Sequence, residues 1–304
     1  MDDIRSESQY DLWSDWLLHR RHADDVEYAR VVRAMVERYA DRVLDGAQLA
    51  SGMTLADIGS GEGLIAFRAI DRIGPSLRVL LTDISLPMVR HAKEQALQRG
   101  VSHQCILLQC PAENLAVNNA SVDVAATRSV LAYIPNKNAA LREFHRVLKP
   151  GGRISLAEPL FRDEALVAKA LRDHLDTQPS ECRERFLILI HRWKSAQFPD
   201  TEEKISMSPI TNYTERDLLR LVQESGFIKI HLEFHVDVLP CVFPSWKAFL
   251  DSSPHPWAPS LGAILAKRFS LEERQFLEQI VRPGIESGQS TTIDRMVYIT
   301  ATKP

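Results

Sequence analysis

Residues 55–63 read Leu55-Ala56-Asp57-Ile58-Gly59-Ser60-Gly61-Glu62-Gly63, an apolar run that passes into a glycine-rich turn. A helical pattern follows over residues 64–70. Glycines suit a turn whose backbone lies against a ligand, because a Cβ would clash there. The first N–H groups of the next helix are free at the same place. The stretch predicts a nucleotide-type cofactor site, although turns of this kind also occur simply as tight bends.

The spacing of the glycines distinguishes between ligand classes. The dinucleotide fingerprint G-x-G-x-x-G requires its third glycine at position 64, which is Leu64, whereas the third glycine here is Gly63. The next apolar strand, residues 77–82, ends in Asp83, whose carboxylate can accept hydrogen bonds from two ribose hydroxyls. Alternatively, Asp83 only caps the helix that begins near Ser85. The spacing disfavours NAD, while Asp83 fits either class of ligand.

Four segments in order resemble the motifs of class I S-adenosylmethionine-dependent methyltransferases, especially the small-molecule group called the methyltransferase 11 family. The resemblance runs from about residue 54 to residue 159. Four ordered matches are more specific than one glycine turn. The matching segments are residues 57–63, 83–88, 123–131 and 141–153, the last being a helix stopped by Pro150-Gly151-Gly152.

The resemblance implies a place for each part of the cofactor. The turn around Gly59 and Gly61 would cradle the methionine part, and Asp83 would hold the ribose. Ile84 and Met88 would pack on the adenine. The residues expected to bind the cofactor are Tyr10, Asp57, Gly59, Ser60, Gly61, Asp83, Ile84, Met88, Ala112, Glu113 and Arg128.

The sequence departs from the family at two positions. Pro111 replaces the acidic residue that usually reaches the adenine amino group. The N–H of Ala112 remains an expected contact to the adenine ring, and Glu113 is a substitute carboxylate. Arg128 is expected beside the methionine part, through its backbone. Position 132, often histidine in relatives, is Ala132, which removes one general base.

The composition limits the classes of function. A chain of 304 residues with 45% hydrophobic and 25% charged residues can bury a full α/β core and carry added helices. A formal net charge of −3 provides no basic field for nucleic acid. The cysteines Cys105, Cys110, Cys182 and Cys241 form no CxxC pair and no metal-binding spacing. With no signal peptide or long apolar span recognised, we expect a cytoplasmic protein without metal or membrane partner.

Apolar runs alternate with helical stretches, which predicts a Rossmann-like α/β fold. We expect a seven-stranded, mostly parallel sheet with helices on both faces. The expected strands lie near residues 53–58, 77–82, 104–109, 122–127, 152–158, 227–238 and 292–302. The expected segments are an N-terminal helical extension or lid (1–50), the cofactor-binding core (51–159), a helical insertion (160–212), a core continuation (213–238), a second insertion (239–290) and the last core strand (291–304).

The segments outside this core are expected to decide the acceptor. Trp13, Trp16 and Leu17 lie at helical spacing, so they either pack on the core or, with Tyr10, close over the cofactor. In small-molecule relatives, an insertion at 160–212 commonly roofs the acceptor pocket. A helix from Ser270 to about Val281 is expected within the second insertion, packed on the core or on another subunit. The chain is therefore expected to be a monomer or a homodimer.

The reaction requires mainly that acceptor, methyl group and sulfur are aligned, because methyl transfer from a sulfonium is an in-line displacement with a good leaving group. A base is needed only when the acceptor must lose a proton. The candidates are Tyr133, Glu158, His174 and His191, each of which is alternatively a packed or surface residue. Aromatic residues in the insertions indicate a flat, apolar acceptor, such as an indole-like secondary metabolite, with O-, N- and C-methylation open.

Two other functions remain open at this point. The first is a noncatalytic S-adenosylmethionine-binding regulatory subunit, which would bind the cofactor and transfer nothing. The second is a nicotinamide-dependent oxidoreductase, which Leu64 already disfavours.

Overall fold

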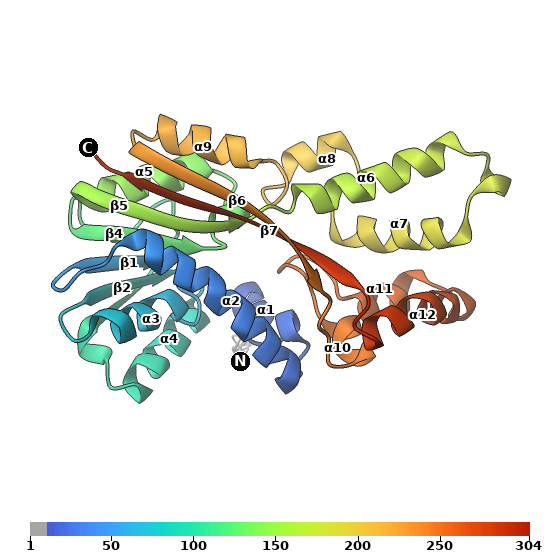
Figure 1. Ribbon diagram of the computed structural model, residues 1–304, viewed down its shortest axis with the longest axis horizontal. Coiled ribbons are helices and arrows are strands. Elements are labelled where there is room, and N and C mark those ends of the chain that lie inside the picture. The colour runs from blue at the N-terminus through green and yellow to red at the C-terminus, as the bar shows by residue number, and fades with distance from the viewer. Residues whose placement is uncertain (1–10) are drawn as a thin grey trace, which may run out of the picture.

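One sheet of seven strands organises the protein, in the order β3-β2-β1-β4-β5-β7-β6. The computed structural model describes residues 11–304 (Figure 1). The pairs β1/β2, β2/β3, β1/β4 and β4/β5 are parallel, whereas β7 runs antiparallel between β5 and β6. The predicted seven-stranded, mostly parallel sheet is confirmed. The strands are β1 (Thr54–Ile58), β2 (Arg78–Asp83), β3 (Cys105–Gln109), β4 (Val122–Arg128), β5 (Leu148–Pro159), β6 (Ile228–Pro240) and β7 (Thr291–Thr302).

The central strands form because both of their faces are buried, which favours continuous apolar runs over alternation. In β1, Leu55 packs into one hydrophobic core, whereas Ala56 and Ile58 pack into another on the opposite face. Helices cover both faces, as the sequence predicted. The first core includes residues of α2 (Val26–Ala47), α3 (Leu64–Ile73) and α4 (Leu86–Gln98), and the second includes residues of α5 (Lys137–Val147) and α9 (Glu215–Glu224).

Several helices begin at the capping residues that the sequence indicates. Ser85 caps α4 by accepting the N–H of Met88 through its Oγ. The helix α12 (Leu271–Glu286) begins with a capping box at Ser270, as expected. It runs past the expected end near residue 281 and contains Pro283. One proline removes only one backbone donor, so the helix can continue past Pro283. Buried Ile285 provides packing for this extra turn.

Two groups of helices do not cover the faces of the sheet but lie beyond the end of β5 (Figure 1). The strands β6 and β7 stay paired as far as Pro240 and Thr291, whereas β5 pairs with β7 only as far as Met296. This two-stranded extension reaches the second group of helices. A third hydrophobic core joins α7, α11 and α12. The first group comprises α6 (Arg162–Thr177), α7 (Arg185–Gln197) and α8 (Glu202–Met207), and the second comprises α10 (Trp246–Asp251), α11 (Leu261–Arg268) and α12.

The N-terminal part divides into two pieces with different surroundings. The helix α2 packs against β4, β5 and β7, so it belongs to the layer that covers the sheet. The short helices α1 (Leu12–Leu18) and η1 (Arg20–His22) lie apart from the sheet and contact α2, α4 and α10. No helix among residues 11–304 is both long and apolar enough to cross a membrane.

Replacing Phe144 by Ala should destabilise the protein by about 3–5 kcal/mol, because a fully buried phenyl ring leaves a cavity between α5 and the sheet. Urea unfolding monitored by circular dichroism measures this change. Leu97→Ala is the matched control, since Leu97 is 61% exposed on α4 and its loss should shift the free energy of unfolding by no more than about 0.5 kcal/mol. Equal effects of both substitutions would contradict the proposed packing.

Candidate active site

The glycine turn between β1 and α3 requires backbone conformations that L-residues rarely adopt. Gly59, Gly61 and Gly63 have φ angles of +63°, +52° and +78°. A Cβ at Gly59 would lie 2.5 Å from Cγ2 of Val130. Glycine is therefore favoured by conformation at all three positions and by space at Gly59 and at Gly63, where a Cβ would lie 2.4 Å from Cε2 of Phe67. The turn keeps its backbone open toward the cavity described below.

Asp57 supports this turn from behind. Its Oδ2 accepts the N–H of Ala66 at 3.0 Å, in the first turn of α3. The helix needs this acceptor because its N-cap, Gly63, has no side chain. Burial raises the pKa of Asp57 to about 7. Neither Asp57 nor Ser60 lines the cavity, so both lie behind the residues that face a ligand.

Asp83 ties the end of β2 to the turn. Its Oδ2 accepts the N–H of Gly61 at 2.8 Å, and its Oδ1 accepts the N–H of Ser85 at 2.9 Å. Burial raises the pKa of Asp83, while these hydrogen bonds act in the opposite direction. A carboxylate offers about four acceptor sites, so each oxygen can accept a further donor. Asp83 lines the cavity and can bind a diol there.

A cavity of about 870 Å³ begins at this turn and extends toward β7. Such a volume lies in the range of about 300–1,000 Å³ typical of ligand sites. At the end near Asp83 it is lined by Ile84, Ala112 and Glu113, together with Pro111. Met88, which was expected on the adenine, is fully buried and is not part of the lining. Tyr10 lies outside the described residues.

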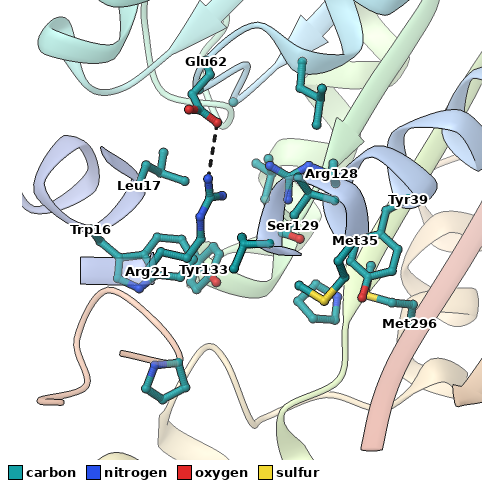
Figure 2. Close-up of a pocket in the computed structure, with 18 of the residues that line it drawn as sticks. Trp16, Leu17, Arg21, Met35, Tyr39, Glu62, Arg128, Ser129, Tyr133 and Met296 are labelled. Atoms are coloured by element: carbon teal, nitrogen blue, oxygen red, sulfur yellow. Dashed lines mark hydrogen bonds and ion pairs between the residues drawn. The ribbon is translucent and has the colours of Figure 1, made fainter. Parts of the chain in front are cut away.

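Two arginines face the cavity beside the turn (Figure 2). Arg21 forms an ion pair with Glu62, with 3.3 Å between Nη2 and Oε2. Its buried Nε finds no hydrogen-bond partner within residues 11–304. Arg128 makes no side-chain hydrogen bond to any residue in that range; burial, and then the charge of Arg21, lower its pKa. Arg128 and Nε of Arg21 thus have donors without hydrogen-bond partners in that range, so this end of the cavity is suited to an anionic group.

Tyr133 lies in an aromatic cluster on the cavity wall. Its ring centroid is 5.3 Å from that of Trp13, 6.4 Å from that of Trp16 and 5.7 Å from that of Trp257. Phe161 completes the cluster at 6.4 Å. Burial raises the pKa of Tyr133, so the hydroxyl keeps its proton at neutral pH.

Glu158 lies beneath the site rather than in it. Its carboxylate accepts the hydroxyl of Thr127 at 2.9 Å and the N–H groups of Val130 and Ala132 at 3.0 Å and 3.1 Å. It is fully buried and does not line the cavity. Glu158 therefore holds the segment after β4 in place, a position that does not fit the expected base.

The two candidate histidines are also remote from the cavity lining. His174 lies on α6, where its Nε2 is 3.0 Å from Nε2 of Gln178. His191 lies on α7, where its Nε2 is 3.2 Å from Oδ2 of Asp200. Helical insertions carry these side chains away from the strand ends. Of the four expected bases, the structure brings only Tyr133 to the cavity.

A polar pair that the sequence did not reveal lies at the end of the cavity formed by α2 and β7. The hydroxyl of Tyr39 on α2 donates to Oδ2 of Asp294 on β7, and both residues line the cavity. Burial raises the pKa of Asp294. The surrounding lining is mostly apolar and includes Met35 and Met296 (Figure 2), although Arg38 also lines the cavity near the pair. The available signal was an acidic residue within the last strand.

The N-terminal helix α1 covers the glycine turn. Cδ1 of Leu17 lies 3.6 Å from the position that a Cβ of Gly61 would take. Nε1 of Trp16 donates to the carbonyl of Ser253 at 3.0 Å, and Arg20 donates to the carbonyl of Pro256 at 2.7 Å. These bonds hold α1 and η1 against the loop after α10. Within residues 11–304, no group of three or more His, Cys, Asp or Glu side chains is placed to hold a metal ion.

The family model described as a methyltransferase domain matches residues 49–225. This range extends from just before β1 to the end of α9 and contains the glycine turn, Asp83 and Arg128. The chain therefore belongs to this methyltransferase family, the class that its motifs resemble. S-adenosylmethionine is the cofactor of that class.

Individual relatives agree with this assignment over part of their length. Nocamycin O-methyltransferase of Saccharothrix syringae is 34% identical over 138 residues, 45% of this chain and 46% of that protein. The ubiquinone/menaquinone biosynthesis C-methyltransferase UbiE of Hahella chejuensis is 32% identical over 127 residues, 42% of this chain and 51% of that protein. This chain thus matches about half the length of these curated relatives.

The crystal structure of the YcgJ protein from Bacillus subtilis has a similar fold. It aligns with a TM-score of 0.56 and 17% identity, covering 88% of this chain and 98% of that one. At this identity the likeness concerns the fold alone.

Asp57→Asn should change how stability depends on pH. Because the folded-state pKa of about 7 lies above the ordinary value of 3.8, the buried charge lowers stability. This penalty is absent below about pH 4, grows as the pH rises to about 7, and is constant above. The Asn oxygen still accepts the N–H of Ala66 without a charge. Urea unfolding from pH 4 to 8 should show wild type losing stability relative to the variant; parallel curves would contradict the role of burial.

Proposed function

We propose that this protein transfers the methyl group of S-adenosylmethionine to a small, largely apolar acceptor held in the same cavity. The observation that carries the proposal is the continuity of one cavity from the glycine turn and Asp83 to the apolar walls of α2 and β7. A cofactor at one end and an acceptor at the other would meet inside it. Such an enclosed arrangement favours alignment of the reacting atoms.

The residues near the turn fit this cofactor in its separate parts. Asp83 would accept the ribose hydroxyls with its remaining lone pairs, and exposed Ile84 would pack on the adenine. The adenine end has Ala112 and Glu113 on the wall, with Pro111 in place of the acid that is usual in the family. Asp57 and Ser60 act through the turn that they support rather than by direct contact.

The methionine end of the cofactor would lie beside Gly61 and the two arginines. Arg128 and the unpartnered Nε of Arg21 are suited to bind its carboxylate. Glu62 offers an opposite charge for its ammonium group. This placement gives Arg128 a side-chain role, where the family resemblance implies only a backbone one. The bound cofactor would thereby pair with a half-buried cation.

The protein contributes alignment and exclusion of water rather than a strong base beside the cofactor. S-adenosylmethionine supplies an electrophilic methyl group on a sulfonium, so the acceptor needs only to be held in line with it. The helix α1, held through Trp16 and Arg20, covers the turn and keeps water out. We infer that α1 is the lid expected of the N-terminal segment.

Tyr133 and Asp294 would act on the acceptor in different ways. Because burial keeps Tyr133 protonated, its hydroxyl donates a hydrogen bond and orients the acceptor instead of deprotonating it. Asp294, which accepts from Tyr39, is the carboxylate at the acceptor end and would take a proton when the acceptor is a phenol or a carbon acid. An amine acceptor would not need this proton transfer.

The acceptor we propose is an aromatic or indole-like secondary metabolite. Aromatic and aliphatic side chains dominate the cavity beyond the turn, which suits a flat apolar molecule. The matched relatives are named as an O-methyltransferase and a C-methyltransferase. The proposal therefore includes O-, C- and N-methylation.

Calorimetry with S-adenosylmethionine and with NADH tests the cofactor assignment. We expect binding of S-adenosylmethionine and none of NADH; the reverse result would contradict the proposal. A screen of aromatic acceptors with methyl-labelled cofactor, followed by mass spectrometry, tests the reaction and locates the methylated atom. Tight cofactor binding without transfer to any acceptor would instead favour a noncatalytic binding protein.

Asp83→Ala should weaken binding of S-adenosylhomocysteine by roughly tenfold to a hundredfold, the effect of about 1.5–3 kcal/mol for hydrogen bonds to a charged group. Isothermal titration calorimetry measures the affinity. Asp71→Ala is the control, because Asp71 is exposed on α3 and lies outside the cavity lining. An unchanged affinity in the Asp83 variant would refute the ribose contact.

Arg128→Met should separate the two ends of the cofactor. The affinity for S-adenosylhomocysteine should fall by roughly tenfold or more, because its carboxylate loses a charged donor. The affinity for adenosine, which has no carboxylate, should stay within about twofold of wild type. Parallel titrations of both ligands measure this difference. Equal losses for both ligands would place Arg128 away from the carboxylate.

A further inference from the structure

A second cavity of about 470 Å³ adjoins the first. Residues that line both cavities mark the boundary between them, and they include Arg21, Tyr28, Phe161, Phe243, Pro254 and Asp294. Asp294, the acceptor-end carboxylate, therefore lies where the two spaces meet. The second cavity, called the outer chamber below, joins the first along these shared residues.

The outer chamber is built by the helices outside the sheet. Its walls include Trp193 on α7, Phe249 on α10, Leu261 on α11 and Val281 on α12. Ile293 adds a side from the part of β7 that is paired only with β6. The insertions and the strand extension thus enclose a space that the methyltransferase core alone would lack. Their packing on one another keeps this space defined.

Most charged and polar groups of the outer chamber have partners, although Nε of Arg21, which lines both cavities, has none within residues 11–304. Nζ of Lys194 lies 3.0 Å from a carboxylate oxygen of Glu164, and Nε of Arg295 lies 2.7 Å from one of Asp163. Gln197 accepts the indole N–H of Trp193 and donates to a backbone carbonyl. Away from Arg21, a ligand needs no charge of its own, and the remaining wall offers aromatic and aliphatic surface.

We propose that the outer chamber receives an uncharged, apolar extension of the acceptor, whose reacting part lies in the first cavity. This inference rests on the proposed function, because it assigns the substrate class of the same site. The acceptor is then elongated, with a ring or nucleophilic end near the cofactor and a hydrocarbon or aromatic portion beyond Asp294. Apolar contact in the chamber provides affinity, and the helices outside the sheet select the length of the extension.

A series of 4-alkylphenols, from phenol to 4-octylphenol, tests this proposal on protein saturated with S-adenosylhomocysteine. Saturation keeps the probes out of the cofactor end. Calorimetry should show the affinity rising by about threefold to fourfold for each methylene that enters the chamber. An affinity that does not change with chain length, or no binding by any phenol, would overturn the proposal.

Val281→Trp should fill the chamber and abolish the rise in affinity for the longer chains, while phenol itself binds as in wild type. Ile280→Trp is the matched control, because Ile280 is an exposed neighbour on the same helix and is not part of the lining. Ser252→Phe, at the end of α10, fills the chamber from another element in case the first variant folds poorly. Chain-length dependence equal to that of wild type in a folded chamber variant would contradict the assignment.

Titration of S-adenosylhomocysteine into every variant separates this proposal from the proposed function. Normal cofactor affinity with no chain-length effect would refute the outer chamber alone. Absence of cofactor binding in wild type would refute the proposed function itself.

Discussion

The hydrogen bond from the N–H of Gly61 to the carboxylate of Asp83 is the contact on which the site depends. It joins the turn after β1 to the end of β2, two points that parallel pairing brings together at Ile58 and Thr82. The turn can approach only because its glycines adopt positive φ angles. The start of α3, the floor of the cavity and the orientation of the carboxylate all follow from this contact.

Around that contact the protein buries ionisable groups whose desolvation costs stability. Asp57 and Glu158 are compensated by backbone donors, and they fix the segments after β1 and β4. Arg128 makes no side-chain hydrogen bond within residues 11–304, and burial lowers its pKa although the charges of Glu62 and Asp57 act in the opposite direction. A site whose arginine lacks a hydrogen-bond partner in this range gains stability when it binds an anionic ligand. The same arrangement links cofactor binding to the stability of the fold.

Strand ends and glycine spacing located Gly61 and Asp83 within a few residues, and the structure brings both to the cavity. These local signals failed for Glu158, since a residue just past a strand can point into the core as well as into a cleft. His174 and His191 lie on insertion helices whose orientation depends on packing far away in the chain. The same long-range packing brings Tyr39 to Asp294, a pair that no local pattern joins.

The added helices convert a shared core into a site of particular size, whereas the cofactor end rests on residues of the core itself. A crystal structure of the protein with S-adenosylhomocysteine tests most directly whether the core residues hold the cofactor as proposed. Our account predicts both ribose hydroxyls within hydrogen-bond distance of Asp83 and the ligand carboxylate at Arg128, with the sulfur facing the space before Asp294. A ligand bound elsewhere, or bound here without contact to Asp83, would contradict it.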